Sequence, residues 1–365
     1  MTKKRLGVAV AGLGFGETVH LQALSHSNSL EPVAIWHHRN ERLEAAKLKH
    51  EIEGYTNWSQ LLDQKEIEAI VIATPPAPRF QLAKEALEAG KHLLLEKPVA
   101  INSTQIRELQ RLALERNLSV AVDFEYRAVP LFIMAKRLLE SEIIGDISFI
   151  KLDWLMSSRA NRSRPWNWYS QKENGGGVIG ALGTHAFDML HWFFGVTKSV
   201  SGLISTSIKE RPINKGNEYR RVTSEDIAIA QLEIEANQSQ CLIPAQVNLS
   251  SVSLSGRGFW LEIYGSDGTI ILGSSNQKDY VHGFGLWLAE GQGEPRIITP
   301  DVDIIFPKTW SDGRIAPVER IHEWWFSSIS TGSPIVPGLL EGLSSQRVCE
   351  KLISSNETGQ RISIK

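Results

Sequence analysis

Residues 6–17 read LGVAVAGLGFGE, an apolar run that passes directly into a glycine-rich turn. A short apolar run bounded by glycines predicts a buried parallel β-strand over Leu6–Ala11, and the pattern after the turn predicts a helix over Thr18–Ser25. Strand, glycine turn and helix in this order are typical of the first unit of a dinucleotide-binding sheet. The turn comprises six residues, namely Gly12, Leu13, Gly14, Phe15, Gly16 and Glu17.

The alternation of strands and helices continues to about residue 125. Further strands are predicted over Pro32–Trp36, Ala69–Ala73, His92–Glu96 and Ser119–Asp123, and helices over Asn40–His50, Arg79–Ala89 and Ser103–Arg116. This alternation predicts an α/β fold with a parallel, doubly wound sheet and helices on both of its faces. We therefore expect residues 1–125 to form an NAD(P)-binding Rossmann domain.

Beyond residue 125 the pattern changes. A helix is predicted over Pro130–Glu140, and another over Ala186–Phe194. Long strands with alternating polarity are predicted over Ser199–Ile208, Thr223–Glu235, Gln240–Leu254, Phe259–Tyr264 and Thr269–Leu272. Such alternation indicates an antiparallel sheet with one face in water or against a partner. Residues 126–365 are therefore expected to form a second domain, for substrate binding and oligomerisation.

Composition excludes several classes of protein. The formal net charge of −2 leaves no overall positive field that would attract nucleic acid or an anionic membrane. No apolar stretch approaches the roughly 18–20 residues of a membrane span. Cys241 and Cys349 provide neither a disulfide framework nor a zinc-binding spacing, so a reduced, cytoplasmic location is expected.

The glycine turn and the end of the second strand predict a cofactor site. A glycine turn lets a pyrophosphate approach the N–H groups at a helix N-terminus. An Asp or Glu that would bind the ribose hydroxyls of NAD is expected about 20 residues further on, but the chain has His37, His38 and Arg39 there. Positive charge favours the 2′-phosphate of NADP, so we expect NADP rather than NAD. Alternatively, Arg39 starts the next helix and faces solvent.

Lys97 follows the strand predicted over His92–Glu96. The carboxyl ends of strands in such a sheet face the ligand, so this lysine is expected near the nicotinamide, where it can exchange a proton with a substrate hydroxyl. The alternative is a solvated surface lysine. Pro98 follows it, and a cis bond there would fix the direction of the lysine.

His185 and Asp188 are spaced to share one face of a helix that follows a glycine run. His185 is a candidate to hydrogen-bond the substrate and to act with Lys97 on its proton, although a lone histidine can equally be structural. His191 on the same helix is expected to be structural. No third ligand at a suitable spacing accompanies these residues, so no metal site is predicted.

Arginines alternate with aromatic residues over residues 159–169. Such a segment can stack on bases, but the net charge favours a sugar-like or anionic small molecule. Trp166 and Trp168 are then candidates for a wall against the sugar, with Arg164 for its hydroxyl or carboxylate groups. The alternative is that both tryptophans pack beneath a loop.

Five segments occur in a characteristic order. They are GLGFGETVH (12–20), VIATPP (71–76), ALEAGKHLLLEKP (86–98), the segment with Arg127 and Pro130, and GGGVIGALGTHAFD (175–188). Together they resemble the Gfo/Idh/MocA oxidoreductases, the relatives of glucose–fructose oxidoreductase and inositol dehydrogenase. The order and spacing match from residue 6 to about residue 195, and the remaining tail is similar more loosely.

The resemblance implies a fold, a reaction and a set of site residues. The second domain would carry a large, open, mostly antiparallel sheet that makes homodimers or homotetramers. Lys97 would be catalytic and His185 would lie on the substrate side, with sugars, inositols or other polyols as substrates. The cofactor would contact the glycine turn, the end of the second strand, and Ala73, Thr74, Pro75, Pro76, Arg79, Glu96 and Lys97. The substrate would contact Glu125, Arg127, Arg164, Trp166, Trp168, His185 and Asp188.

Two positions depart from the family pattern. Ala181 stands where many family dehydrogenases have an aspartate, four residues before the histidine, and Glu17 stands at the third glycine position. These departures keep two other functions open. One is a sensor or regulator that binds a dinucleotide without turnover. The other is a glycosidase that uses bound NAD transiently.

Overall fold

The computed structural model describes residues 5–214, 218–237 and 241–364, and the chain in it forms two compact units. The first unit comprises Met1–Ala128 and Lys308–Leu343, and the second comprises Val129–Pro307 and Ser344–Lys365. The sequence pattern places one boundary near residue 125 and does not indicate that residues 308–343 return to the first unit. The first residue of the strand predicted over Gln240–Leu254 lies outside the described residues.

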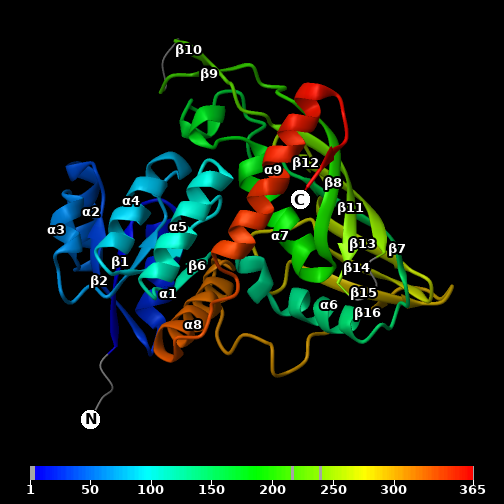
Figure 1. The fold of residues 1–365 in the computed structure, drawn as a ribbon, viewed down its shortest axis with the longest axis horizontal. Coiled ribbons are helices and arrows are strands. Elements are labelled where there is room, and N and C mark those ends of the chain that lie inside the picture. Colours follow the sequence, from blue (N-terminus) through cyan, green and yellow to red (C-terminus); the bar gives the residue numbers. More distant parts are fainter. Residues whose placement is uncertain (1–4, 215–217, 238–240, 365) are drawn as a thin grey trace. The chain divides into compact units, whose positions relative to one another are not determined.

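The first unit is built on a six-stranded parallel sheet with strand order β3-β2-β1-β4-β5-β6 (Figure 1). This is the order of a Rossmann sheet, with the reversal of strand order beside β1. The fold class predicted from the alternating pattern is therefore confirmed. The strands are β1 (Leu6–Ala11), β2 (Leu30–Trp36), β3 (Glu53–Tyr55), β4 (Ala69–Ile72), β5 (His92–Leu95) and β6 (Val120–Val122).

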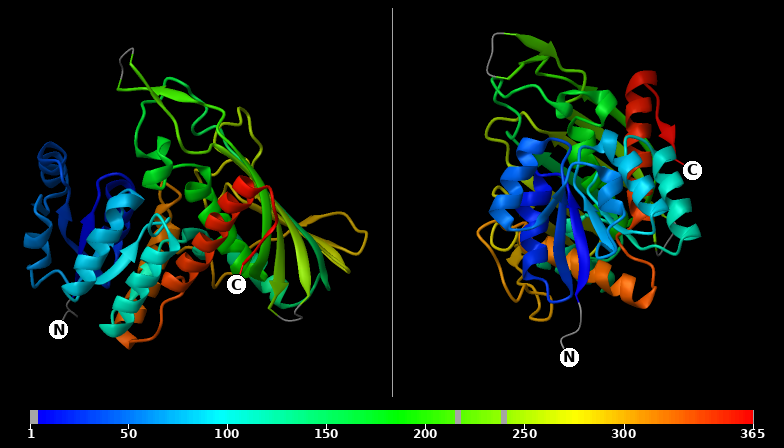
Figure 2. Two further views of the ribbon diagram at one scale, coloured as in Figure 1. Left: turned by 45° about the horizontal axis from the view of Figure 1, so that its top comes forward. Right: turned by 90° about the vertical axis from the view of Figure 1, so that its left-hand side faces the viewer.

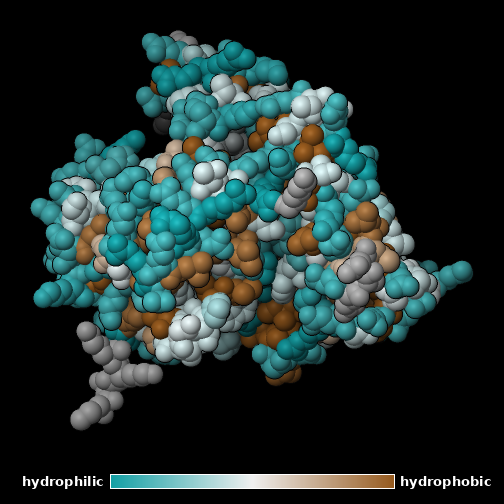
Figure 3. Space-filling view, in the orientation of Figure 1, coloured by the Kyte–Doolittle hydropathy of each residue, from teal (hydrophilic) through white to brown (hydrophobic). Residues whose placement is uncertain are grey.

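Helices cover both faces of this sheet, because its strands are apolar on both sides. One set, α3, α4 and α5, packs on one face, and the other set, α1, α2 and α8, packs on the opposite face. Their bounds are α1 (Leu21–His26), α2 (Asn40–His50), α3 (Trp58–Leu62), α4 (Pro76–Glu88), α5 (Ser103–Glu115) and α8 (Ile315–Thr331). On the face that Figure 3 shows, hydrophilic residues cover most of α2, α4 and α5.

The second unit contains a nine-stranded sheet with order β16-β15-β14-β13-β7-β12-β11-β8-β17. Only the β7–β12 pair among its described strands is parallel, so the predicted mostly antiparallel sheet is confirmed. The strands are β7 (Ile147–Leu155), β8 (Gly195–Ser205), β11 (Ile227–Ala236), β12 (Leu242–Ser250), β13 (Gly258–Gly265), β14 (Gly268–Ser274), β15 (Gly285–Glu290), β16 (Arg296–Ile297) and β17 (Ile362–Ser363).

One face of the large sheet is covered by helices (Figure 2). Phe132 of α6 (Pro130–Glu140) packs on Phe259 of β13, with 5.6 Å between ring centroids. Helix α7 (Thr184–Phe193) and the second half of α9 (Leu339–Thr358) also lie on this side, and Ser355 accepts a hydrogen bond from Gly202 of β8. A separate hairpin pairs β9 (Glu210–Pro212) with β10 (Tyr219–Arg221). Among the described residues, no helix has the length and apolarity of a membrane span.

Candidate active site

The glycine turn after β1 forms a close-packed cradle in the first unit. Gly12 has a φ of 104°, and a Cβ on it would lie 2.7 Å from the carbonyl oxygen of Ala73 at the end of β4. Gly16 lies in the first helical turn, and a Cβ on it would lie 3.0 Å from Val10 Cγ1. Gly14 has nothing within 4 Å of such an atom. Gly12 and Gly16 thus have no room for a side chain, whereas the space beside Gly14, between them, is open. This arrangement fits a bound pyrophosphate.

Glu17 does not occupy the position where the helix approaches the sheet closely. Its carboxylate accepts hydrogen bonds from Lys49 Nζ at 2.8 Å and from His50 Nε2 at 3.1 Å, both at the end of α2. The close approach that the third glycine normally permits is made by Gly16. The departure from the family pattern therefore leaves the turn itself intact, and Glu17 links the π-helical turn Gly16–His20, which precedes α1, to the end of α2.

The end of β2 carries a cluster of nitrogen-containing side chains. His37 Nδ1 lies 3.0 Å from the N–H of Arg39, the residue that precedes α2, and the rings of His37 and His38 stack with centroids 4.5 Å apart. Burial lowers the pKa of His37. Arg42, one turn into α2, donates to the carbonyl oxygen of Leu13 at 3.0 Å and so brings a guanidinium to the glycine turn. The sequence reasoning missed Arg42, although its spacing from Arg39 places both near the start of one helix.

Arg79 of α4 joins the ends of two strands. Its buried guanidinium donates to the carbonyl oxygens of Thr74, Glu96 and Pro98, after β4 and β5. Burial lowers the pKa of Arg79 to about 10. The side chain therefore holds the backbone on both sides of Lys97, and the Lys97–Pro98 peptide bond is cis. The direct cofactor contact expected for Arg79 remains a prediction.

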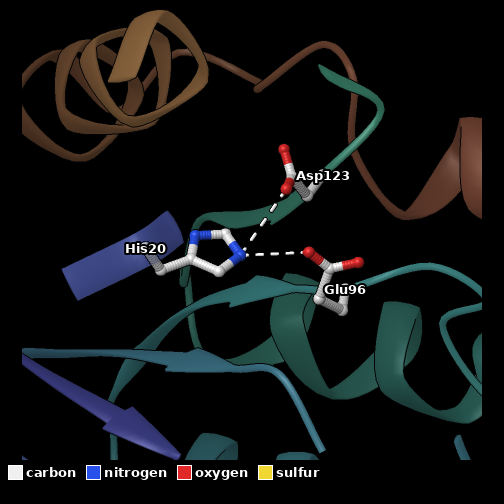
Figure 4. Close-up of side chains that lie close together, drawn as sticks. All are labelled: His20, Glu96 and Asp123. Atoms are coloured by element: carbon white, nitrogen blue, oxygen red, sulfur yellow. Dashed lines mark hydrogen bonds and ion pairs between the residues drawn. The ribbon is translucent and has the colours of Figure 1, made fainter. Parts of the chain in front are cut away.

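A buried network of ionisable groups includes Glu96, the residue before Lys97. Figure 4 shows its members His20, Glu96 and Asp123. His20 Nε2 is 3.1 Å from Glu96 Oε1 and 3.5 Å from Asp123 Oδ2, and His20 Nδ1 is 3.0 Å from His322 Nε2 of α8. If neutral His20 donates from Nε2 to Glu96, its Nδ1 accepts from His322. The His20, Glu96 and Asp123 ligand atoms also lie within 4.8 Å of one another, close enough to share a metal ion. The expectation of no metal remains a prediction.

The carboxyl groups of this network differ strongly in acidity. Burial alone would raise the pKa of Glu96, but the hydrogen bond with His20 and the charges of Lys97 and Arg79 lower it to about 2. Burial and the Glu96 charge raise the pKa of Asp123 well above its usual value. Burial raises the pKa of Glu125 to about 7, against the opposing charge of Lys97. Glu96 is therefore ionised at neutral pH and Glu125 titrates near neutrality, while Asp123 holds a proton more readily than an ordinary aspartate does.

The second unit carries His185 and Asp188 on α7, where both are buried. The His185 ring lies against Trp154 of β7, with 6.1 Å between centroids. A π-helical turn over Ile179–Gly183 leads directly into α7, and Ala181 lies in this turn. Glu225, before β11, accepts a hydrogen bond from the Ile179 N–H at 2.9 Å. The sequence reasoning also missed this carboxylate.

The segment over residues 159–169 also lies in the second unit. Trp166 donates from Nε1 to the carbonyl oxygen of Arg221 at 3.0 Å, and the guanidinium of Arg220 lies 4.4 Å from its ring centroid. The Trp168 ring makes an edge contact with Tyr169. Arg164 is exposed and bonds weakly, at 3.4 Å, to the Ser158 carbonyl oxygen. Trp166 thus packs on the β9–β10 hairpin, and its contact with a sugar remains a prediction.

Arg127 is also buried, in the first unit, two residues after Glu125. Thr74 and Pro76 are buried around the Arg79 site, and Pro75 immediately precedes α4. The structure thus brings the backbone of Ala73 and Thr74 close to Gly12 of the glycine turn. It also brings the carbonyl oxygens of Thr74 and Glu96 to the Arg79 guanidinium. His185, Asp188, Arg164, Trp166 and Trp168 belong to the other unit.

Comparison with known proteins accounts for both units. Residues 6–124 match the model of the oxidoreductase family NAD-binding Rossmann fold, and residues 136–364 match that of its C-terminal alpha/beta domain. The chain belongs to the Gfo/Idh/MocA oxidoreductase family. It is 43% identical over 350 residues to an uncharacterised oxidoreductase of Synechocystis, an alignment covering 95% of this chain and 93% of the relative.

Relatives of known activity are more distant. Levoglucosan dehydrogenase of Pseudarthrobacter phenanthrenivorans is 24% identical over 315 residues, covering 82% of this chain and 80% of the relative. A solved structure of levoglucosan dehydrogenase with NADH and L-sorbose has a TM-score of 0.87 at 20% identity and covers 100% of both chains. At this identity the structural likeness supports the fold. The family membership makes this protein an oxidoreductase with an NAD-binding domain.

Proposed function

We propose that this protein is an NAD(P)-dependent dehydrogenase that transfers a hydride between the nicotinamide and a sugar- or polyol-like alcohol or the corresponding carbonyl. The observation that carries the proposal is the setting of Lys97. It follows β5, the backbone on both sides of it is held by Arg79, and its charge acts on three buried acidic groups, Glu96, Asp123 and Glu125, whose pKa values are shifted in different directions. A lysine fixed in this way is suited to exchange a proton with a substrate hydroxyl.

The surrounding carboxyl groups support this role of Lys97. The bound nicotinamide would supply or accept the hydride. In the oxidative direction the neutral Lys97 amine takes the hydroxyl proton, and in the reductive direction the ammonium gives it back. Burial and the Glu96 charge raise the pKa of Asp123 well above its usual value, so Asp123 holds a proton more readily than an ordinary aspartate does. Burial raises the pKa of Glu125 to about 7 against the charge of Lys97, so this carboxyl can exchange a proton near neutral pH.

We also propose that the cofactor is NADP rather than NAD. The glycine cradle would hold the pyrophosphate of either dinucleotide. Preference for the 2′-phosphate is supported by the absence of a carboxylate at residues 37–40, after β2, and by Arg39 and Arg42 at the start of α2. The match to an NAD-binding family model supports NAD(H) binding in general.

His185 keeps the substrate-side role that the family resemblance gives it, with Asp188 on the same helix. We also propose that the substrate contacts Trp166, Trp168, Arg164 and Arg127. One of the relatives named above is a levoglucosan dehydrogenase, which supports a small-molecule substrate of the sugar class for the present chain.

The nine-stranded sheet is the proposed surface for a homodimer or homotetramer. Its face opposite α7 and α9 carries Leu203 and Ile229, which pair across β8 and β11 and are 62% and 39% exposed. These adjacent exposed apolar side chains support a partner contact at this face. Sedimentation velocity tests this proposal, because Ile229→Lys should shift the protein to monomers, and an unchanged sedimentation coefficient would contradict it.

The experiment that tests the function is a survey of sugars, inositols and other polyols with NAD+ and with NADP+, followed by the absorbance of the reduced nicotinamide. We expect turnover on at least one of these alcohols, and faster turnover with NADP+. A protein that binds the cofactor and reduces none of it with any alcohol would contradict the proposal. Release of an aglycone from a glycoside without net cofactor reduction would instead identify a glycosidase.

A further inference from the structure

We propose that Glu225 is a positioning residue for His185, and that its carboxylate fixes the N-terminal end of the helical segment on which His185 lies. The proposal rests on the proposed function in one respect, since the effect on catalysis depends on the substrate role of His185. The placement of His185 itself can be measured without substrate.

The first support is a pair of hydrogen bonds from one residue to the start of the segment. The backbone carbonyl oxygen of Glu225 accepts from the Val178 N–H at 3.0 Å, and its Oε1 accepts from the Ile179 N–H at 2.9 Å. These are N–H groups at a helix N-terminus, which lack partners within the helix and favour negative charge. Glu225 thus supplies both an acceptor and the complementary charge from the segment that precedes β11.

The second support is the glycine run that precedes the segment. Gly177 has a φ of 107°, and a Cβ on it would lie 2.2 Å from Glu225 Oε1. A Cβ on Gly176 would lie 2.3 Å from the carbonyl oxygen of Tyr169. Residue 177 is therefore a glycine because the carboxylate of Glu225 occupies the space that a side chain on residue 177 would need. The family resemblance gives the run as a motif, and this contact supplies a physical reason for it.

The groups around Glu225 define its charge. Its side chain is about as buried as those of the protein core, and burial raises its pKa to about 7, partly opposed by the hydrogen bond from Ile179. Lys172 provides an opposite charge, and Asp226 a like charge. Burial, together with the charge of Glu225, raises the pKa of half-buried Tyr169 and of buried Cys349. Cys349 of α9 contacts the same helical turn, since its Sγ lies 3.9 Å from the Ile179 carbonyl oxygen.

The path from Glu225 to His185 is one continuous helical backbone. The π-helical turn Ile179–Gly183 passes into α7 without a break, and the Thr184 N–H bonds to the Ile179 carbonyl oxygen. His185 follows one residue later and packs on Trp154 of the sheet. A shift at Ile179 is therefore transmitted to the imidazole, because helix geometry is stiff over so few residues. Ala181 provides no acidic side chain in this turn. The carboxylate of Glu225 accepts the hydrogen bond from the N–H of Ile179, the first residue of the turn.

The test compares the full-length protein with Glu225→Gln and Glu225→Asp. Glutamine keeps the length and an acceptor oxygen but loses the charge, and aspartate keeps the charge but is one methylene short of the Ile179 N–H. The matched control is Glu233→Gln on β11, whose carboxylate pairs with Ser199 and Arg361 in the same sheet. The substrate-free readout is the NMR signal of the His185 ring, assigned by its loss in His185→Asn. The catalytic readouts are kcat and the KM for the cofactor.

We expect both Glu225 variants to shift the His185 ring signal and to lower kcat about tenfold or more, with the cofactor KM unchanged. Glu233→Gln should change neither. An unmoved His185 signal in both Glu225 variants would overturn the proposal, as would an unchanged kcat. If the wild-type protein oxidises no alcohol, the proposed function fails, and the ring signal still decides the role of Glu225. If glutamine unfolds the protein, the aspartate variant gives the same two readouts.

Discussion

Replacing Arg79 with methionine removes a buried cation that bonds three carbonyl oxygens. Each charge-assisted hydrogen bond contributes about 1.5–3 kcal/mol, so the three together stabilise the fold by about 6 kcal/mol. Burial of the guanidinium opposes this, since lowering its pKa from 12.5 to about 10 corresponds to roughly 3 kcal/mol. We therefore expect Arg79→Met to lower the free energy of unfolding of the first unit by about 3 kcal/mol.

The same change should impair the proposed reaction. Arg79 holds the carbonyl oxygens of Glu96 and Pro98, on either side of Lys97, and a displacement of about 1 Å at a reacting group can lower the rate about 100-fold. Urea denaturation followed by circular dichroism measures the stability, and nicotinamide absorbance measures kcat.

Arg116→Met is the matched control for this prediction. Arg116 also donates to a carbonyl oxygen, that of Glu88, but it does so at the surface. Its removal should lower the unfolding free energy by less than about 1 kcal/mol and leave kcat unchanged. The reasoning would be refuted if Arg79→Met unfolded at the urea concentration of the wild type and retained its kcat.

Three further changes test other parts of the site. Gly12→Ala should destabilise the fold by about 3 kcal/mol in thermal unfolding, because of its φ of 104° and its contact with β4, whereas Gly14→Ala should not, and equal stabilities would contradict this. Glu125 has a folded pKa of about 7 against 4.5, so its stabilisation is present below about pH 4.5 and lost as the pH rises through 7. Glu125→Gln should remove about 3 kcal/mol of that pH dependence in urea denaturation, and an unchanged profile would speak against the shift. Ala in place of Arg39 or Arg42 should raise the KM for NADP+ and spare that for NAD+; equal effects on both would count against a 2′-phosphate site.

Much of the first unit is predictable from the sequence because its signals are local. The β1 strand and α2 have the predicted bounds, since an apolar run between glycines and a helical period are each contained within a few residues. Strand β3 and helix α3 were missed, because three to five residues are too few to establish a period. The β10 strand is exposed at all three residues and has no alternation to detect.

The parts of the site that the sequence does not reveal depend on contacts between distant segments. His20 contacts His322, which lies 302 residues further on, in the segment that returns to the first unit. Arg79 bonds to carbonyl oxygens after β5 that are 17 and 19 residues away, so its backbone role is not visible in the local sequence. Glu225 is 46 residues from Ile179. The glycine run was visible in the sequence, and the carboxylate that requires Gly177 was not.

The measurement that tests the central claim most directly is the rate of cofactor reduction by the Lys97→Met variant, with the best alcohol substrate of the wild type. The affinity of the same variant for NADP+ is measured in parallel. Methionine preserves the approximate volume of the side chain and removes the amine that exchanges the substrate proton. The account predicts that cofactor affinity is retained while turnover falls by at least about 100-fold. Wild-type turnover in Lys97→Met would contradict it.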